Sequence, residues 1–369
     1  HATALDDRKH ERQNKPPNIC NTSPDEPKCV LRKRYYLHDE AQKNYETGLS
    51  ESRTGVNITE EELQAFDAVL HELTMKGQSV HAAIVSNPDK FSVSEKSVYG
   101  YINGGLLTTT RGHLPRACKL KPRKRKSVEF RVDKTCRINR TWDDYLKFVE
   151  ANPGMRVVEM DTVEGVKGGK VLLTMIFNPF NFMLAFLINA KTSECVLGVF
   201  AAITDALKER YGNGWRKMFT RLFPIILTDN GSEFTNPSAI ESDDEGQRTF
   251  VFYCKPYASY QKPHIERNHE YIRRVLPKGN AYTETTSFNN LTQDKVTLMM
   301  SHINSYVREG LDNTTPYNLF TSEFGEEVAE LFGIVRIAAN DVTLKPSLLG
   351  IEVKIKEGIS LTEKETLNK

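Results

Sequence analysis

The chain has 369 residues, of which 39% are hydrophobic and 27% charged. This length is too great for one ordinary core and indicates two or three domains, and the composition excludes a disordered chain. The formal net charge of +2 by itself neither favours nor excludes a nucleic-acid partner. Because the chain begins at His1 instead of methionine, we expect that an upstream segment is missing.

Residues 1–55 form a polar segment with weak periodicity, in which the stretch KRYYLHDEAQKNYE can be helical. Cys20 and Cys29, with His10 and His38 nearby, could contribute to a zinc site. No CxxC spacing accompanies them, so we do not expect zinc. No secretory signal is visible, and the six cysteines are therefore expected to be reduced in the cytoplasm.

Residues 56–110 carry apolar residues at helical spacing in three runs, 58–75, 78–85 and a run that ends near Gly104. Ser92 followed by Glu95 predicts a capping box at the start of the third helix. Three short helices in this order predict a helix-turn-helix DNA-binding domain, with a small helical bundle as the alternative. The third helix would present three polar side chains to DNA: Lys96, Ser97 and Tyr99.

Residues 111–150 are predicted to be a basic linker. Between Arg111 and Arg140 the chain has twelve lysines and arginines but only two acids, a net charge of +10, so the rest of the chain sums to −8. A concentrated basic block in an otherwise acidic chain is typical of a contact with a polyanion, although a solvated linker is the alternative. The residues at its centre that we expect to contact DNA phosphates are Arg123, Lys124, Arg125 and Lys126.

Residues 151–310 change to a pattern of strands and helices. Three strands in a meander, a helix, a strand, a helical connection and a further strand–helix unit predict an α/β fold with a ribonuclease-H-like core and a mixed five-stranded sheet. The very apolar stretch 171–188 is interrupted by Asn178 and Pro179, which predicts a hairpin in the core rather than a membrane span. The GVKGGK segment, residues 165–170, lacks the spacing of a phosphate-binding loop and is expected to be a hairpin turn. Residues 311–369 are expected to form a C-terminal extension.

Carboxylates follow two of the predicted strands. Asp161 and Asp229 each lie at the end of an apolar run, and adjacent core strands can hold such acids side by side when cations neutralise them. Gly231 would allow the backbone to turn sharply beyond the second acid. Glu266, in the first turn of a helix that begins at Pro263, could reach the strand ends, and so could Glu270 one turn later. Hard oxygen ligands of this kind favour Mg²⁺, for which Mn²⁺ can substitute.

Four segments carry a resemblance to a known family: EMDTVEGVKGGKVLLTM, LTDNGSEF, FYCKPYASYQKPHIERNHEYIRRVLPKGNAY and INSYVREGLDNTTPYNLF. In this order they resemble the insertion-sequence-thirty family of bacterial transposases, which have an integrase-type catalytic core. The resemblance implies an acidic triad at Asp161, Asp229 and Glu266, and so favours Glu266 over Glu270. It also implies basic positions at Arg273 and Lys278, beside which Arg274 could hold phosphates.

The function that the resemblance implies is metal-dependent cleavage and transfer of DNA strands at the ends of an insertion sequence, by two-metal phosphoryl transfer. The expected partners are double-stranded DNA, as terminal inverted repeats and target, and further copies of the chain assembled on that DNA. No membrane partner is expected, and the location would be the bacterial nucleoid. Two alternatives are a retroelement-type integrase and a sequence-specific DNA-binding regulator built on an inactive transposase scaffold.

Overall fold

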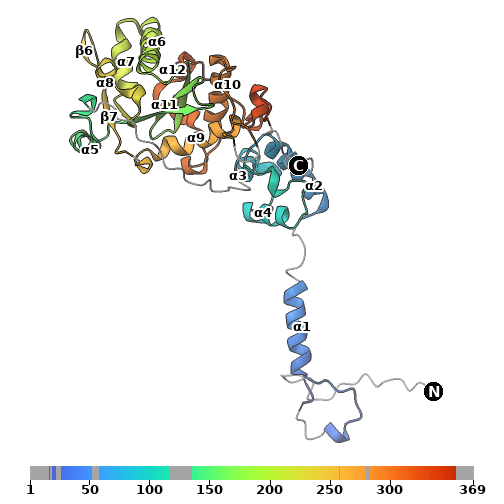
Figure 1. The fold of residues 1–369 in the computed structure, drawn as a ribbon. Helices are drawn as coiled ribbons and strands as arrows, with labels where there is room; N and C mark the ends of the chain where they lie inside the picture. Colours follow the sequence, from blue (N-terminus) through green and yellow to red (C-terminus); the bar gives the residue numbers. More distant parts are fainter. Residues whose placement is uncertain are drawn as a thin grey trace. The chain divides into compact units, whose positions relative to one another are not determined.

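The structure, a computed structural model, describes residues 16, 19–21, 26–51, 58–115, 135–256, 258–279 and 283–354 (Figure 1). The chain divides into two units, His1–Glu60 and Glu61–Lys369. In the first unit, helix α1 (His38–Glu51) confirms the predicted helical stretch. The elements described below belong to the second unit. No described helix combines the length and apolar character that a membrane crossing would need.

A mixed sheet of five strands lies at the centre of the second unit, in the order β3-β2-β1-β4-β7 (Figure 1). β1 pairs antiparallel with β2, β2 pairs antiparallel with β3, and the pairs β1–β4 and β4–β7 are parallel. This arrangement confirms the predicted ribonuclease-H-like α/β fold. The strands are β1 (Val157–Glu164), β2 (Val171–Phe177), β3 (Phe182–Ile188), β4 (Ile225–Thr228) and β7 (Phe250–Tyr253), and β5 (Ser242–Asp243) and β6 (Gly246–Gln247) form a separate short hairpin.

Helices cover both faces of this sheet. Alternate residues of β1 point to opposite faces, as the strand period requires. On one face, Val157 packs with β4, β7 and α5, and on the other Met160 belongs to a core that includes Phe200 of α6 and Phe219 of α7. The helices are α5 (Trp142–Ala151), α6 (Ser193–Tyr211), α7 (Trp215–Leu222), α8 (Pro237–Glu241), α9 (Pro263–Val275), α10 (Gln293–Asn304), α11 (Pro316–Phe324) and α12 (Glu326–Leu331).

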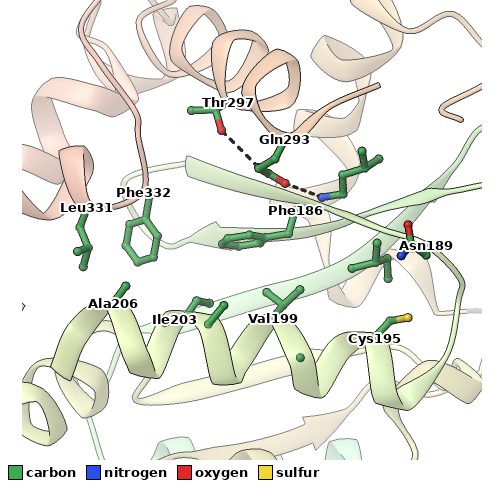
Figure 2. Close-up of a pocket in the computed structure, with 14 residues that line it drawn as sticks. Phe186, Asn189, Cys195, Val199, Ile203, Ala206, Gln293, Thr297, Leu331 and Phe332 are labelled. Carbon is green, nitrogen blue, oxygen red and sulfur yellow. Dashed lines mark hydrogen bonds between the residues drawn. The ribbon is translucent and has the colours of Figure 1, made fainter. Parts of the chain in front are cut away.

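The edge strand β3 is covered by side-chain amides of α10. Gln293 accepts from Leu187 N at 2.8 Å and donates to Ala185 O at 3.0 Å, as Figure 2 shows in part. Asn304 accepts from Met183 N at 2.9 Å and donates to Met183 O at 2.8 Å. These amides satisfy backbone groups that an edge strand would otherwise offer to another chain. An apolar cavity of about 530 Å³ lies beside this edge, lined by β3, α6 and α12 (Figure 2).

Three helices precede the sheet: α2 (Glu60–Met75), α3 (Val80–Ser86) and α4 (Glu95–Asn103). They confirm the predicted helical runs, but the capping prediction was wrong, because α4 is capped by Ser94, whose side chain accepts from Ser97 N, and not by Ser92. The link between α3 and α4 runs from Asn87 to Ser94 and includes a 3-10 turn, so it is longer than the three or four residues usual in a helix-turn-helix.

These three helices pack against the C-terminal part of the chain. Gln78, which is 1% exposed, donates to Ala339 O and Val342 O, both at 2.9 Å, and Leu344 N donates to Lys76 O at 2.8 Å. The predicted linker likewise ends in helix α5, which the sequence analysis missed and which packs on β7. The helices α2–α4, α5 and the predicted C-terminal extension are therefore parts of the same compact unit as the sheet.

Candidate active site

Asp161 and Asp229 occupy matching positions on adjacent parallel strands. The register of β1 on β4 pairs Val157 with Ile225 and Glu159 with Leu227, so two further residues bring Asp161 opposite Asp229. Neighbouring strands lie about 5 Å apart, and residues two apart point to the same face. Asp161 therefore lies within β1, on the face that also carries Glu159, and Asp229 directly follows β4. The expectation that the first strand ends at Asp161 was wrong, because β1 continues to Glu164 through its pairing with β2.

The thiol of Cys254, directly after β7, lies among these carboxylates. Its burial raises the pKa of Cys254 to about 12, with further raising contributions from the negative charges of Glu159, Asp229 and Asp161 and an opposing one from Lys262. The loop after Asp229 is fixed to the same place, because Asn230 Nδ2 donates to Cys254 O at 2.6 Å. The charges of Glu159, Asp161 and Asp229 therefore all act on the Cys254 thiol.

A buried ammonium group neutralises Asp161. Lys262, which is only 4% exposed, lies with Nζ 3.1 Å from Asp161 Oδ2 and donates to Met160 O at 3.2 Å. The other carboxylate oxygen of Asp161 accepts from Thr162 N at 2.7 Å. A lysine is rarely buried unless it is paired with an anion. The positive charge of Lys262 and the negative charge of Asp161 therefore stabilise each other.

Helix α9 packs on β1 and β2 and carries Glu266 in its first turn. Lys262, four residues before Glu266, contacts Asp161, and His269, three residues after it, lies with Nε2 2.8 Å from Thr174 Oγ1. Thr174 is the partner of Asp161 across the β1–β2 ladder. Positions three and four apart share a helix face, so Glu266 lies on the side of α9 that faces Asp161. Glu270 instead lines a cavity on another side of the helix.

A buried carboxylate on β1 fixes the start of α9. Glu159, which is 3% exposed, accepts from Ile265 N at 2.8 Å and from Asn178 Nδ2 at 2.9 Å. The Ile265 N–H is one of the amide groups that a helix N-terminus leaves without an internal acceptor. Burial raises the pKa of Glu159, while the hydrogen bond from Ile265 opposes that rise. Glu159 therefore acts as an N-terminal cap supplied by the strand that carries Asp161.

Glu233 supports the loop that follows Asp229. Its side chain is buried, accepts from Thr162 Oγ1 at 2.8 Å and lies 3.4 Å from Lys191 Nζ. Burial raises the pKa of Glu233, and the Lys191 charge lowers it. A Cβ atom at Gly231 would lie 2.3 Å from this carboxylate, whereas the Gly231 backbone has an ordinary φ of −63°. A side chain at position 231 would therefore require Glu233 to shift, and the turn beyond Asp229 does not depend on the conformational freedom of a glycine.

The donor chemistry of the site fits a hard divalent cation. Asp161 and Asp229 offer carboxylate oxygens, which Mg²⁺ prefers, and the ammonium of Lys262 shows that a positive charge is stabilised beside Asp161. In the described part of the chain, no three histidine, cysteine, aspartate or glutamate side chains are grouped closely enough to hold a metal ion. The predicted triad of Asp161, Asp229 and Glu266 therefore does not form such a group in the described structure.

The residues predicted to contact DNA have different surroundings. Lys96 and Lys278 are exposed, and Ser97 is bonded to Ser94 through its hydroxyl at 2.9 Å. Arg273 is half-buried and donates to Glu164 O at 2.7 Å, so it contacts the end of β1. Tyr99 and Arg274, which are far apart in the sequence, line the same cavity. The four basic residues of the predicted linker lie outside the described residues: Arg123, Lys124, Arg125 and Lys126.

The sequence analysis missed Lys262 and Glu159 as parts of the site, and it interpreted His269 only as a structural or DNA-facing residue. Each is separated from its partner by about a hundred residues along the chain. Only the lysine carried a local signal, because it directly precedes the proline that begins α9 and therefore lies at the helix N-terminus.

The chain is similar to two curated transposases. It is 26% identical over 219 residues to the probable transposase for insertion-like sequence element IS1161 of Streptococcus salivarius, an alignment that covers 58% of this chain and 56% of that protein. It is 28% identical over 99 residues to the transposase for insertion sequence element IS4351 of Bacteroides fragilis, covering 27% of this chain and 28% of that protein. The chain thus spans about half the length, or less, of these relatives.

Among solved structures, the catalytic core domain of BIV integrase matches with 17% identity and a TM-score of 0.30, covering 47% of this chain and 99% of that one. A TM-score this low supports no functional comparison. No protein-family profile matches the chain. Membership of the insertion-sequence-thirty family therefore stays a prediction.

Proposed function

We propose that the chain is the catalytic part of an insertion-sequence transposase, which cleaves DNA strands and joins them by metal-dependent phosphoryl transfer. The observation that carries this proposal is the register of the parallel strands β1 and β4, which, extended by two residues, places Asp161 of β1 beside Asp229, directly after β4. The similarity to transposases of insertion sequences supports it. The substrates would be the terminal inverted repeats of the element and its target DNA, bound by more than one copy of the chain.

In this proposal Asp161 and Asp229 hold the metal ions, and Glu266 completes the second site. Mg²⁺, or Mn²⁺ in its place, supplies activation of the attacking hydroxyl and stabilisation of the leaving oxygen of the phosphodiester. Lys262 balances the charge of Asp161 before a metal ion binds, and Glu159 holds the start of α9 so that Glu266 stays on the side of Asp161. The backbone of Asp229 is held by the Asn230 contact with Cys254.

The test uses the full-length protein, labelled element ends and Mg²⁺, with nicked and joined products as the readout. Asp161→Asn or Asp229→Asn should lower cleavage and joining by about a thousandfold or more, because each removes a metal ligand, and should leave DNA binding within about twofold of wild type. Glu266→Gln should act in the same way. Glu270→Gln is the matched control, four residues along the same helix, and should lower joining by about tenfold at most.

Three other outcomes would contradict the proposal. Near-wild-type joining by either aspartate variant would remove that residue from the site. The reverse pattern for the two glutamates would move the third ligand to Glu270. Specific DNA binding without cleavage by the wild-type protein would favour the regulator built on an inactive scaffold.

A further inference from the structure

A cavity of about 940 Å³ lies between α9 and the pair α3–α4, on a different side of α9 from the proposed metal site. The α9 residues that line it are His264, Arg267, Asn268, Glu270, Tyr271 and Arg274. The rest of its wall comes from α3, α4 and the segment that follows α10, and includes Tyr99, Tyr306 and Arg308. A strand of DNA that passes Glu266 would need to travel only about the width of one helix, roughly 10 Å, to reach this cavity.

Arg308 is a buried cation in the wall of this cavity. It is 8% exposed, donates to Asn268 Oδ1 and, at 3.3 Å, to Ile303 O, and its Nε has no hydrogen-bond partner. Its acceptors are therefore neutral. Burial, together with the neighbouring Arg274, lowers the pKa of Arg308 to about 10. Arginine is rarely buried unless an anion pairs with it, so the free energy of this site would improve if an anion entered.

Arg274 adds a second guanidinium at the same place. It lies 4.7 Å from the centroid of the Tyr271 ring, and Arg308 lies 4.6 Å from the same centroid. Arg274 Nη1 is buried without a partner. In the described part of the chain, neither guanidinium forms an ion pair with a carboxylate, and Glu95 of the same wall is bonded to His81 at 2.9 Å. The wall also carries Glu270 and Glu309. Guanidiniums that contact one ring and form no ion pair favour binding of an anion such as a phosphate group.

Tyr99 supplies a flat apolar surface on the α4 side. It is 37% exposed and lines the cavity, and in the described part of the chain its ring stacks on no other aromatic ring. A nucleotide presents a phosphate and an aromatic base, which are the two chemical groups that this wall can bind. A duplex carries its phosphates on a broad convex surface, so it cannot bring one to a guanidinium that is 8% exposed, whereas an unpaired strand can bend into the recess.

We propose that this cavity binds one unpaired nucleotide of the DNA strand that flanks the cleaved phosphodiester, with its phosphate on Arg274 and Arg308 and its base against Tyr99. This inference rests on the proposed function, because it assumes that DNA reaches α9. In this proposal Tyr99 and Arg274 both bind unpaired DNA, and neither contacts a DNA duplex.

The test compares the binding of two labelled DNAs by the full-length protein in EDTA, where no cleavage occurs. One is a blunt duplex, and the other is the same duplex with a short unpaired thymidine tail. Tyr99→Leu and Arg274→Gln should each weaken binding of the tailed DNA by roughly tenfold and binding of the blunt duplex by less than twofold. Arg274→Gln should also lower the slope of log K against log salt for the tailed DNA by about 0.7. Arg210→Gln on α6, which removes the same charge outside the cavity, should change neither DNA.

Three results would overturn the inference. Equal losses on both DNAs would mean a duplex contact, and unchanged binding of the tailed DNA would mean that no nucleotide occupies the cavity. Competition by inorganic phosphate that disappears in Arg274→Gln, without any effect of the variants on the tailed DNA, would mean a site for free phosphate only. Unchanged thermal midpoints of the variants exclude misfolding. A wild-type protein that prefers the tailed DNA but never cleaves would refute the proposed function alone.

Discussion

His269 connects α9 to the strand that pairs with Asp161. Its Nε2 lies 2.8 Å from Thr174 Oγ1, and the Thr174 hydroxyl donates to Asp161 O at 3.1 Å, so the imidazole must act as the donor to the threonine. Burial, followed by the positive charges of Lys262 and Arg273, lowers the pKa of His269 to about 3. The folded protein therefore keeps this imidazole neutral at pH values where an exposed histidine is protonated.

We expect the free energy of unfolding to fall as the pH drops from 6.5 toward 3. The unfolded chain binds a proton at residue 269 near pH 6.5 and the folded chain only near pH 3, so this stabilising contribution is complete above pH 6.5 and is lost below it. One such histidine contributes a slope of about 1.4 kcal/mol per pH unit. Urea unfolding at several pH values between 7 and 5 measures this slope.

His269→Gln keeps an N–H donor for Thr174 and removes the titration, so its stability should depend less on pH than that of the wild type. His38→Gln, at a side chain that is 83% exposed in the other unit, should leave the slope unchanged. Parallel curves for His269→Gln and the wild type would show that this imidazole does not control acid stability.

At the scale of elements, the edge strand β3 depends on α10 for two kinds of hydrogen bond. Asn304 is fully buried, and its amide serves both the N–H and the carbonyl of Met183. Gln293 does the same for Leu187 and Ala185 at the exposed start of α10 (Figure 2). The hydrogen bonds of Asn304 and Gln293 have the same pattern, but only those of Gln293 are accessible to water, which can replace them.

Asn304→Leu should therefore destabilise the protein by about 2–5 kcal/mol, because it leaves a buried N–H and a buried carbonyl without partners. Gln293→Leu should cost less than about 1 kcal/mol, since water can bond the freed groups of β3. Denaturant unfolding of the two variants gives both values. Similar losses of unfolding free energy in Asn304→Leu and Gln293→Leu would mean that the contribution of these hydrogen bonds does not depend on how deeply each amide is buried.

At the scale of the second unit, the helices α2–α4 are bound to the C-terminal part of the chain. Gln78 donates to two carbonyls of the 339–342 segment, and Ser79 is bonded to Tyr306 through its N–H at 3.0 Å and its hydroxyl at 2.8 Å. The cavity proposed to bind a nucleotide exists only because these helices lie against α9. We therefore expect the three helices and the sheet to unfold together.

Gln78→Ala should lower the stability of both parts by about 2–4 kcal/mol, because it removes the donor of one buried and one partly buried carbonyl. Hydrogen exchange followed by mass spectrometry would then show faster exchange in α2 and in β1 alike. Lys76→Ala removes an exposed i,i+4 pair with Glu72 and should cost less than about 1 kcal/mol. Loss of protection in α2–α4 alone would support a separate helix-turn-helix domain over residues 56–110.

The sequence by itself determined the order along the chain of the five strands in the central sheet. The strands 171–177 and 182–188 are apolar throughout because the sheet is covered on both faces. Apolar runs of this kind can be recognised in the sequence without any tertiary information. The same holds for α6, whose apolar residues repeat at helical spacing. The acids Asp161 and Asp229 were found because each follows such a run.

Only the tertiary structure decided which residues surround those acids. Asp161 contacts Lys262 and the backbone N–H of Thr162, and Glu159 caps the start of α9. The contacts with Lys262 and α9 form only because α9, about a hundred residues later in the sequence, packs on β1. A local sequence pattern cannot predict that packing. It depends on the register between β1 and β4 and on which side of α9 is apolar and faces the sheet. For the same reason Tyr99 and Arg274, predicted to contact DNA separately, share one cavity that no local pattern could indicate.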